Sequence, residues 1–261
     1  MSRHFLIIGA QRCGTTYLRR LLDQHPAVLM AAPDVPEPKV FLSDEVLQRG
    51  LEWYDATWFA DAAGRDDLLL GEKSTSYLEH PDAAARAVRV LGGAQVIVQL
   101  RDPVERAVSN WQLSTRHGLE TRDLVEALTA NLAAPTPWDP ERTSVSPYAY
   151  LERGRYVDYL DPWQEAFGDR LRLQFLEDLR ARPVIGETYR WLGVDPDVRP
   201  PSLGEPVNQS TRRPPPLPSG LVARLRDWFA GSDRALAELV GREVPWPTAA
   251  STSKGHRDRA T

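Results

Sequence analysis

The stretch that most constrains the fold is residues 4–22, HFLIIGAQRCGTTYLRRLL. An apolar run at 5–8 leads into a turn-rich loop at 9–14, and residues 15–22 have helical spacing. An unbroken apolar run predicts a strand buried on both faces, as in a parallel sheet. A strand, a glycine loop and a helix in this order bind phosphate, because the first N–H groups of a helix lack internal partners. The sequence therefore predicts an α/β fold with an anion site near its start.

The composition of the loop indicates which anion it binds. Gly9 and Gly14 have the GxxxxG spacing of a nucleotide P-loop, but Thr15 stands where that motif has lysine. Arg12 supplies a cation inside the loop, and Thr15 and Thr16 offer hydroxyl donors at the start of the helix. We therefore expect the loop to bind an anion other than ATP with magnesium. The alternative is a tight turn that binds no ligand.

A second motif overlaps the first. Cys13 and Arg19 form C-x5-R, the spacing of cysteine-dependent phosphatases, and a helix N-terminus favours a reactive thiolate. Such a site needs the intervening residues to wrap the phosphate, whereas here they have helical spacing. We keep this reading as a minor alternative.

Composition excludes several classes of protein. The net charge of −4 gives no general case for nucleic acid as a partner, and the single cysteine excludes an internal disulfide. No apolar run is long enough to cross a membrane or to form the core of a signal peptide, so we expect a cytoplasmic protein. The five histidines show no ligand spacing, so we expect no metal site.

Charged residues follow three further predicted strands. Arg101 ends the apolar strand at 95–100, where a nucleotide triphosphatase would carry an acidic residue for magnesium. Lys73 follows a predicted strand at 68–70 and could face the same anion. Glu37 lies between two prolines after a predicted strand at 27–32, and alone it would be interpreted as a solvated loop carboxylate. The carboxyl ends of strands are where open α/β sheets bind ligands.

Periodicity predicts the remaining elements. The aromatic residues at 53, 54, 58 and 59 have helical spacing and are expected to pack in the core. Pro162 predicts a kink or break in its helix. A proline-rich segment at 199–218, either a linker or a lid, contains Arg212 and Arg213, which suit phosphate contact. We expect one domain over 1–246 and a disordered tail over 247–261. A further strand is expected at 171–175, and helices are expected at 15–22, 47–59, 82–90, from 103 onward, and at 123–132, 154–167, 184–192, 217–229 and 234–240.

These segments in this order resemble the sulfotransferases that use 3′-phosphoadenosine 5′-phosphosulfate (PAPS), in particular the branch with the heparan sulfate sulfotransferases and bacterial relatives. The matching segments include IIGAQRCGTTYLRRLLDQHP, PEPKVFL, GEKSTSYL and VIVQLRDPVERAVSNW. The resemblance implies a P-loop-like three-layer α/β domain with a central parallel sheet flanked by helices.

The resemblance also implies roles for individual residues. Glu37 matches the catalytic base, although Pro36 replaces the lysine that many members have before it. Lys73 matches a lysine that contacts the reacting groups, and Arg12 stands where many members have lysine. Lys39, Phe41 and His117 are assigned to the acceptor. The residues assigned to the donor are Gln11, Arg12, Cys13, Gly14, Thr15 and Thr16 at the phosphosulfate, Arg101 and Ser109 at the 3′-phosphate, and Arg212 and Arg213 in the late loop.

The predicted function is sulfuryl transfer from PAPS to a hydroxyl of a sugar, glycolipid or natural-product acceptor, without a metal, leaving adenosine 3′,5′-bisphosphate. A P-loop kinase or NTPase acting on a small molecule is the alternative enzyme, and a non-catalytic nucleotide-binding module is the third class. Neither the acceptor nor the oligomeric state can be read from the sequence.

Overall fold

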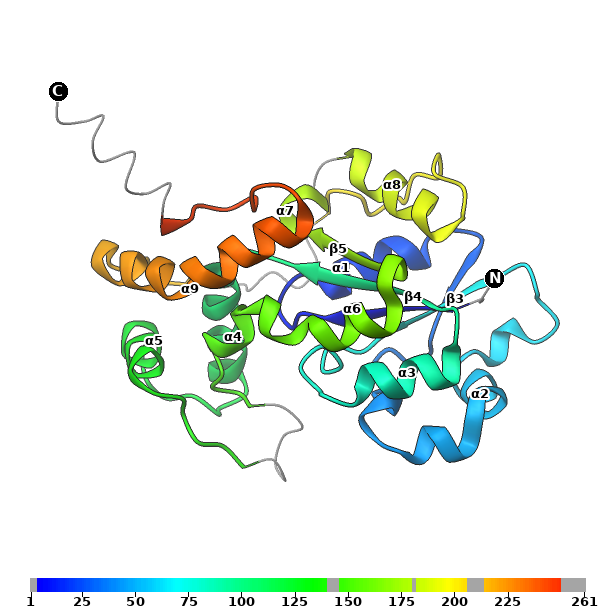
Figure 1. Ribbon diagram of the computed structural model, residues 1–261, viewed down its shortest axis with the longest axis horizontal. Coiled ribbons are helices and arrows are strands. Elements are labelled where there is room, and N and C mark those ends of the chain that lie inside the picture. Colours follow the sequence, from blue (N-terminus) through cyan, green and yellow to red (C-terminus); the bar gives the residue numbers. More distant parts are fainter. Residues whose placement is uncertain (1–3, 140–145, 180–181, 206–213, 250–261) are drawn as a thin grey trace. The chain divides into compact units, whose positions relative to one another are not determined.

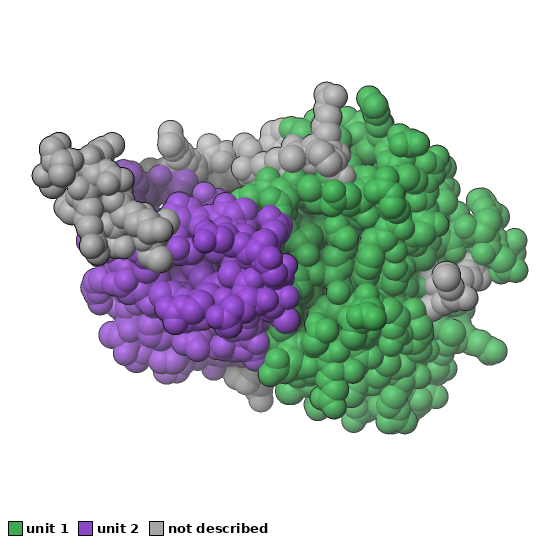
Figure 2. All heavy atoms as spheres, turned by 45° about the horizontal axis from the view of Figure 1, so that its top comes forward, with its two compact units in different colours: residues 1–100, 159–209 green, residues 101–158, 210–261 purple. Residues whose placement is uncertain are grey.

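The computed structural model describes residues 4–139, 146–179, 182–205 and 214–249. The chain divides into two compact units (Figure 2). Unit 1 comprises residues 1–100 and 159–209, and unit 2 comprises residues 101–158 and 210–261. We predicted a single domain over 1–246. Whether the two units form one domain stays a prediction.

Unit 1 is built on a five-stranded parallel sheet with the order β2-β3-β1-β4-β5. From the central strand β1 the chain adds β2 and β3 on one side, and later β4 and β5 on the other. The carboxyl end of β1 therefore lies where the strand order reverses, which is the ligand position in open α/β sheets. The strands are β1 (His4–Gly9), β2 (Val28–Met30), β3 (Leu69–Lys73), β4 (Gln95–Leu100) and β5 (Leu171–Phe175).

Helices cover both faces of this sheet (Figure 1). On one face, Phe5 and Ile7 of β1 and Ile97 of β4 join a buried cluster with side chains of α1 (Thr15–Asp23) and α8 (Arg182–Leu192). Leu6 and Ile8, the alternate residues of β1, are equally buried, and α3 and α6 lie on the other face of the sheet (Figure 1). The apolar run at 5–8 is thus a strand buried on both faces, and the predicted three-layer architecture with a central parallel sheet is confirmed. The other helices of unit 1 are α2 (Glu45–Trp58), α3 (Ala83–Leu91), α6 (Asp161–Phe167) and α7 (Leu176–Leu179).

The third strand differs from the expectation. It was expected at 68–70, but β3 continues to Lys73, in register with Ile7 of β1. Glycine and charged residues are poor strand formers, and the parallel pairing with a central strand overrides that propensity. Lys73 is thus the last residue of a strand and not a loop residue.

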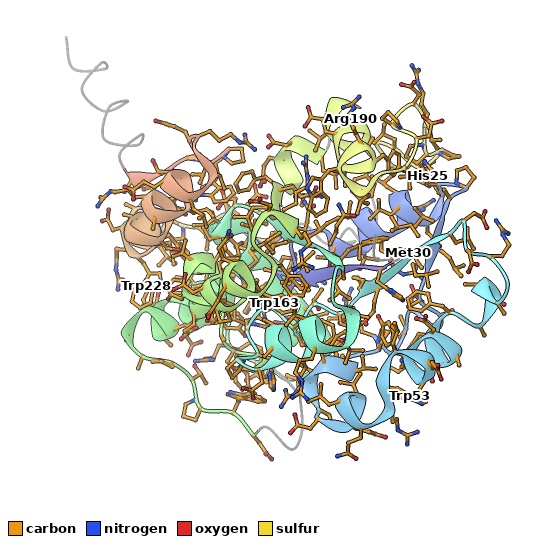
Figure 3. All side chains as sticks on the ribbon, turned by 45° about the vertical axis from the view of Figure 1, so that its right-hand side comes forward. His25, Met30, Trp53, Trp163, Arg190 and Trp228 are labelled. Atoms are coloured by element: carbon orange, nitrogen blue, oxygen red, sulfur yellow. The ribbon has the colours of Figure 1, made fainter. Side chains whose placement is uncertain are left out.

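The aromatic residues of α2 and its C-cap residue, Phe59, divide between core and surface. Tyr54 and Phe59 are buried, as predicted, with their ring centroids 5.6 Å apart. Trp53 and Trp58 are only half-buried, and Trp53 lies under the guanidinium of Arg49 at 4.9 Å from the ring centroid (Figure 3).

Unit 2 is helical in its described part. Its α-helices are α4 (Pro103–Arg116), α5 (Leu124–Ala133) and α9 (Ser219–Val240), packed around a cluster that includes Leu128, Tyr150 and Phe229. A buried ion pair joins two of these helices, because Arg226 of α9 donates two hydrogen bonds of 2.7 and 2.8 Å to Asp102. Asp102 also accepts hydrogen bonds from the backbone of Val104 and Glu105 and caps α4.

Two helix predictions were wrong in their extent. The single helix expected at 154–167 is instead two 3₁₀ turns, Glu152–Gly154 and Tyr156–Tyr159, followed by α6. Pro162 explains the break, because proline has no N–H and is tolerated only in the first turn of a helix. The two helices expected at 217–229 and 234–240 are one continuous helix, α9. Phe229 and Leu236 are completely buried on either side, so apolar packing keeps residues 230–233 helical.

Gly71 allows close packing at the centre of the sheet. A β-carbon added there would lie 2.2 Å from Cζ of Phe5 and 2.6 Å from Sδ of Met30. We expect Gly71→Ala to lower the free energy of unfolding by about 2 kcal/mol through overpacking. Gly231→Ala in α9 is the matched control, because nothing lies within 4 Å of its β-carbon, and it should stabilise by about 1 kcal/mol. Urea unfolding checks both values, and equal effects at the two sites would contradict the packing argument.

Burial raises the pKa of Asp233 in unit 2 to about 6, against the opposing effects of Trp246 and Arg226. The folded state therefore holds the proton more tightly than the unfolded state, and this contribution to stability is lost as the pH rises from 3.8 to above about 6. Asp233→Asn removes it, so the variant should gain on the order of 3 kcal/mol over the wild type across that range. Urea unfolding at several pH values measures the difference. Asp227→Asn, at an exposed position of the same helix, is the control, and a flat difference for Asp233→Asn would contradict the assignment.

Candidate active site

The candidate site of unit 1 lies where β1 and β3 end. Beyond β3, the N–H of Ser74 donates to the carbonyl of Ile7 at 3.0 Å. The N–H of Leu78 donates to the carbonyl of Ile8, also at 3.0 Å. The segment after β3 therefore runs beside the end of β1, from which the loop 9–14 starts.

The loop 9–14 is held in a conformation that few residues adopt. Gly9, Arg12 and Gly14 have positive φ angles of 152°, 71° and 81°. The N–H of Ala10 anchors the loop to β4 through the carbonyl of Gln99 at 2.7 Å. Since a non-glycine residue rarely has a positive φ, the Arg12 backbone carries strain of the kind that clusters at ligand sites.

The loop delivers the first turn of α1 in a form that suits an anion. The N-cap residue, Gly14, has no side chain to cap the helix, and the first turn contains no acidic residue. A β-carbon at Gly14 would also lie 2.6 Å from Cδ1 of Leu176. Thr15 is buried and Thr16 half-buried at the start of α1. Uncapped N–H groups and a positive helix end fit a phosphate or sulfate ester.

The structure does not support the cysteine-phosphatase reading. The Cys13 side chain is completely buried, with Sγ 3.9 Å from the carbonyl oxygen of Gln11, which is itself half-buried. Arg19 lies inside α1, donates to the carbonyl of Ala31 at 3.3 Å and pairs with Asp34 at 3.6 Å. A thiolate nucleophile needs access and an arginine on the same anion, and this arrangement provides neither.

Glu37 is held in a fixed position and is not a solvated carboxylate. Its Oε1 pairs with Nζ of Lys73 at 2.8 Å, and only 18% of the Glu37 side chain is exposed. Its Oε2 accepts the N–H of Thr75 at 3.0 Å and the hydroxyl of Thr75 at 3.1 Å. One strand end thus supplies both a cation and two donors to a carboxylate from a distant loop.

Lys39 and Phe41 follow Glu37 in a tight turn. Lys39 has a positive φ of 54°, and its N–H donates to Oγ of Ser74 at 3.0 Å. The N–H of Phe41 donates to the hydroxyl of Tyr77 at 3.3 Å. The ring of Phe41 is completely buried between those of Tyr54 and Tyr77, while Lys39 is half-buried.

Glu72 is a second carboxyl group, completely buried next to this turn. It accepts hydrogen bonds of 2.6 Å from the hydroxyls of Tyr54, Ser74 and Tyr77. Burial raises the pKa of Glu72, the three hydroxyls oppose that effect, and the charge of Glu37 adds to it.

Sequence reasoning did not single out Thr75 or Glu72. The available signal was the segment GEKSTSYL, in which polar residues continue from a buried strand into the site. Polar residues at the carboxyl end of a parallel strand favour ligand contacts along the whole segment and not at Lys73 alone.

The other predicted residues belong to unit 2 or lie outside the described residues. Arg101 is paired with Glu105 at 2.6 Å, and its carbonyl accepts the Tyr156 hydroxyl at 2.7 Å. Ser109 is half-buried on α4, and His117 is exposed at the end of that helix. Residues Arg212 and Arg213 lie outside the part of the chain that the structure describes.

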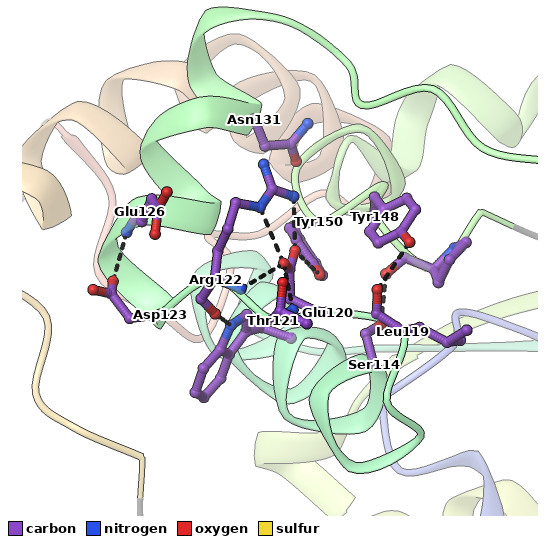
Figure 4. A network of polar contacts seen from close by, with 12 residues as sticks. Ser114, Leu119, Glu120, Thr121, Arg122, Asp123, Glu126, Asn131, Tyr148 and Tyr150 are labelled. Atoms are coloured by element: carbon purple, nitrogen blue, oxygen red, sulfur yellow. Dashed lines mark hydrogen bonds and ion pairs between the residues drawn. The ribbon is translucent and has the colours of Figure 1, made fainter.

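A polar network in unit 2 holds the loop after α4 (Figure 4). Glu120 accepts hydrogen bonds from Arg122 at 2.7 Å and from the Tyr150 hydroxyl at 2.9 Å. Burial raises the pKa of Glu120, but the hydrogen bonds from Arg122 and Tyr150 outweigh it and hold the pKa below its usual value. Tyr148 donates to the carbonyl of Leu119 at 2.9 Å. Residues 119–122 are therefore a braced segment.

Among residues 4–139, 146–179, 182–205 and 214–249, no cluster of three or more His, Cys, Asp or Glu side chains is arranged to hold a metal ion. Within the same residues no helix is long and apolar enough to cross a membrane.

Comparison with solved structures supports the fold. The sulfotransferase of Alicyclobacillus acidocaldarius aligns with a TM-score of 0.71 at 24% identity, over 92% of this chain and 96% of that one. The P-loop-like α/β class predicted from the sequence is thereby confirmed.

Comparison of sequences gives the family. The bifunctional heparan sulfate N-deacetylase/N-sulfotransferase 1 of Caenorhabditis briggsae is 30% identical over 198 residues, which are 72% of this chain and 22% of that protein. The bifunctional heparan sulfate N-deacetylase/N-sulfotransferase 2 of Bos taurus is 32% identical over 74% of this chain and 22% of its own length. The chain thus spans about a fifth of the length of these relatives. The family described as "Sulfotransferase domain" matches residues 2–197, and the chain belongs to that family, the sulfotransferases.

Proposed function

We propose that this protein transfers the sulfuryl group of PAPS to an acceptor hydroxyl, with Glu37 as the general base. The observation that carries the proposal is the carboxylate of Glu37, fixed by Lys73 at 2.8 Å and by Thr75, at the strand end beside the loop 9–14. An in-line transfer from an anionic donor requires a base for the acceptor proton and a cation for the developing negative charge, both next to the loop that binds the anion.

PAPS supplies an activated sulfuryl group when it is bound. Glu37 takes the proton of the acceptor hydroxyl as the new O–S bond forms, and the electron pair of the breaking S–O bond passes to the 5′-phosphate oxygen. Lys73, Arg12 and the backbone N–H groups of residues 14–16 stabilise the charge that develops on that oxygen, whereas the N–H of Cys13 already donates to the carbonyl of Ala10 at 3.2 Å. The uncapped first turn of α1 supports this role.

Arg101 and Ser109 are assigned to the 3′-phosphate of the same donor. Arg101 directly follows β4, and its guanidinium is only 21% exposed and already pairs with a carboxylate, that of Glu105. A guanidinium held at the start of a helix suits a bidentate phosphate contact. Arg212 and Arg213 are proposed to contribute further donors from the loop 199–218.

The acceptor class is also part of the proposal. Lys39, Phe41 and His117 are assigned to it, and a sugar, glycolipid or natural-product hydroxyl is the proposed target. The relatives are named for N-sulfation of heparan sulfate, so an amino sugar belongs in the same screen. Action in the cytoplasm on a small-molecule or glycan acceptor, without a metal, completes the proposed function.

The direct test is incubation with ³⁵S-labelled PAPS and a panel of hydroxyl and amino acceptors, read by mass spectrometry. A sulfated product together with adenosine 3′,5′-bisphosphate supports the proposal. Magnesium-dependent turnover of ATP without a sulfated product would favour the kinase alternative, and binding of the bisphosphate without any transfer would favour a non-catalytic module.

Glu37→Gln removes the base but keeps the size of the side chain. We expect turnover to fall at least about 100-fold, because a positioned general base contributes that much, while adenosine 3′,5′-bisphosphate still binds. Initial rates and calorimetry measure the two quantities. Glu45→Gln, at an exposed salt-bridged position, is the matched control, and near-normal turnover in Glu37→Gln would remove Glu37 as the base.

Arg101→Ala separates the two phosphates of the nucleotide. We expect the variant to bind adenosine 3′,5′-bisphosphate at least about 10-fold more weakly, since a charge-assisted hydrogen bond is lost. Binding of adenosine 5′-phosphate should change less than about 3-fold. Calorimetry with both nucleotides measures this, with Arg155→Ala, an exposed ion-paired arginine of unit 2, as the control. Equal losses for the two nucleotides would contradict the assignment of Arg101 to the 3′-phosphate.

A further inference from the structure

The buried carboxyl of Glu72 lies at the centre of a hydrogen-bond arrangement that reaches the loop of the proposed base. Oε1 of Glu72 accepts from Ser74 and from Tyr77, each at 2.6 Å, and Oε2 accepts from Tyr54 at 2.6 Å. The carboxyl of Glu72 is completely buried and contacts no solvent. Such a group is costly to bury unless its hydrogen bonds are satisfied.

The backbone of residues 39–41 donates hydrogen bonds to two of these hydroxyls. The N–H of Lys39 donates to the hydroxyl oxygen of Ser74 at 3.0 Å, and the N–H of Phe41 donates to the hydroxyl oxygen of Tyr77 at 3.3 Å. Because an N–H only donates, each hydroxyl accepts there and is left with its own proton to donate. Both protons point at one oxygen, Oε1 of Glu72.

This arrangement ties two parts of the proposed site together. The turn at 39–41 starts two residues after Glu37, and Lys39 in that turn has a left-handed backbone with φ of 54°. Glu72 immediately precedes Lys73 in β3, so neighbouring residues of one strand reach the base and the turn that follows it. A backbone in an unfavourable conformation persists only where its surroundings hold it.

We propose that Glu72 is a positioning residue for Glu37: its Oε1 orients the hydroxyls of Ser74 and Tyr77, which hold the backbone of residues 39–41 and so aim the base. The inference rests on the proposed function, because it assumes that Glu37 acts on the acceptor. It needs only an accepting Oε1. A proton on Oε2 is accommodated as well, because the oxygen of Tyr54 can accept it, and the hydroxyl of Tyr54 bonds Glu72 and not the backbone of the turn.

The chain provides a matched pair of variants. Tyr77→Phe and Ser74→Ala each delete a hydroxyl that links Glu72 to the turn, whereas Tyr54→Phe deletes a hydroxyl that bonds Glu72 but not the turn. Glu72→Gln is the conservative rescue, because the amide oxygen accepts both hydroxyls and the amide nitrogen donates to Tyr54.

We expect Tyr77→Phe and Ser74→Ala to lower kcat about 10-fold or more, because small misplacements of a catalytic group are costly. The affinity for adenosine 3′,5′-bisphosphate should change less than about 3-fold, since the loop 9–14 is untouched. Tyr54→Phe and Glu72→Gln should stay within about 3-fold of the wild-type kcat. Amide hydrogen exchange at residues 39 and 41 should accelerate in Tyr77→Phe and Ser74→Ala only.

One outcome would overturn the inference and leave Glu72 a packing residue. In that outcome kcat falls equally in Tyr54→Phe, Tyr77→Phe and Ser74→Ala, and the fall follows the decrease in their melting temperatures. Unchanged kcat and exchange in Tyr77→Phe and Ser74→Ala would also overturn the inference. A Glu37→Gln variant measured in parallel separates the two proposals. If it keeps full turnover, the proposed base is wrong, whereas loss of turnover there with no effect at Ser74 and Tyr77 makes only the positioning role wrong.

Discussion

The parallel pairing of β1 with β3 is the constraint on which the chemistry of unit 1 depends. It places Lys73 in register with Ile7, and Ile7 lies two residues before the start of the loop 9–14. The same pairing continues through the N–H of Ser74 to the carbonyl of Ile7. A shift of this register would separate the lysine from the loop, and a shift by one residue would also exchange the two faces of the strand. The buried ring of Phe5 against Gly71 opposes such a shift, because only glycine fits at that position.

Several buried carboxyl groups in both units are held by fixed partners. In unit 1 a carboxylate from the loop 33–39 meets Lys73 and Thr75, and Glu72 meets three hydroxyls. In unit 2 Asp102 caps α4 and accepts both guanidinium nitrogens of Arg226. The cost of removing these charged groups from water offsets much of their attraction, so these contacts define geometry more than they add stability. Arg101 directly precedes Asp102, the N-cap of α4. The contacts of Asp102 therefore also hold the backbone of Arg101 in place.

The sequence was sufficient for whatever depends on local pattern. The strands at 95–100 and 171–175 were predicted with the bounds of β4 and β5, and the helix after Gly14 began where expected. Local pattern failed where distant packing decides the outcome. Burial of Phe229 and Leu236 on either side of residues 230–233 keeps α9 continuous through a segment that resembles a turn, and pairing with β1 extends β3 over Gly71. The local sequence predicted a solvated carboxylate at Glu37, because its partners lie 36 and 38 residues further along the chain. Only the resemblance to a family singled it out.

The loop that carries Glu37 has two halves with different surroundings. Its first half, residues 33–36, is exposed, and Val35 presents 79% of its surface. Its second half, from Lys39 to Phe41, is bound to Ser74 and Tyr77. Mutational tolerance should therefore change abruptly within a few residues. A lineage, or a directed-evolution library, can therefore change residues 33–36 while the neighbouring turn, and the backbone on which Glu37 is mounted, keeps its shape.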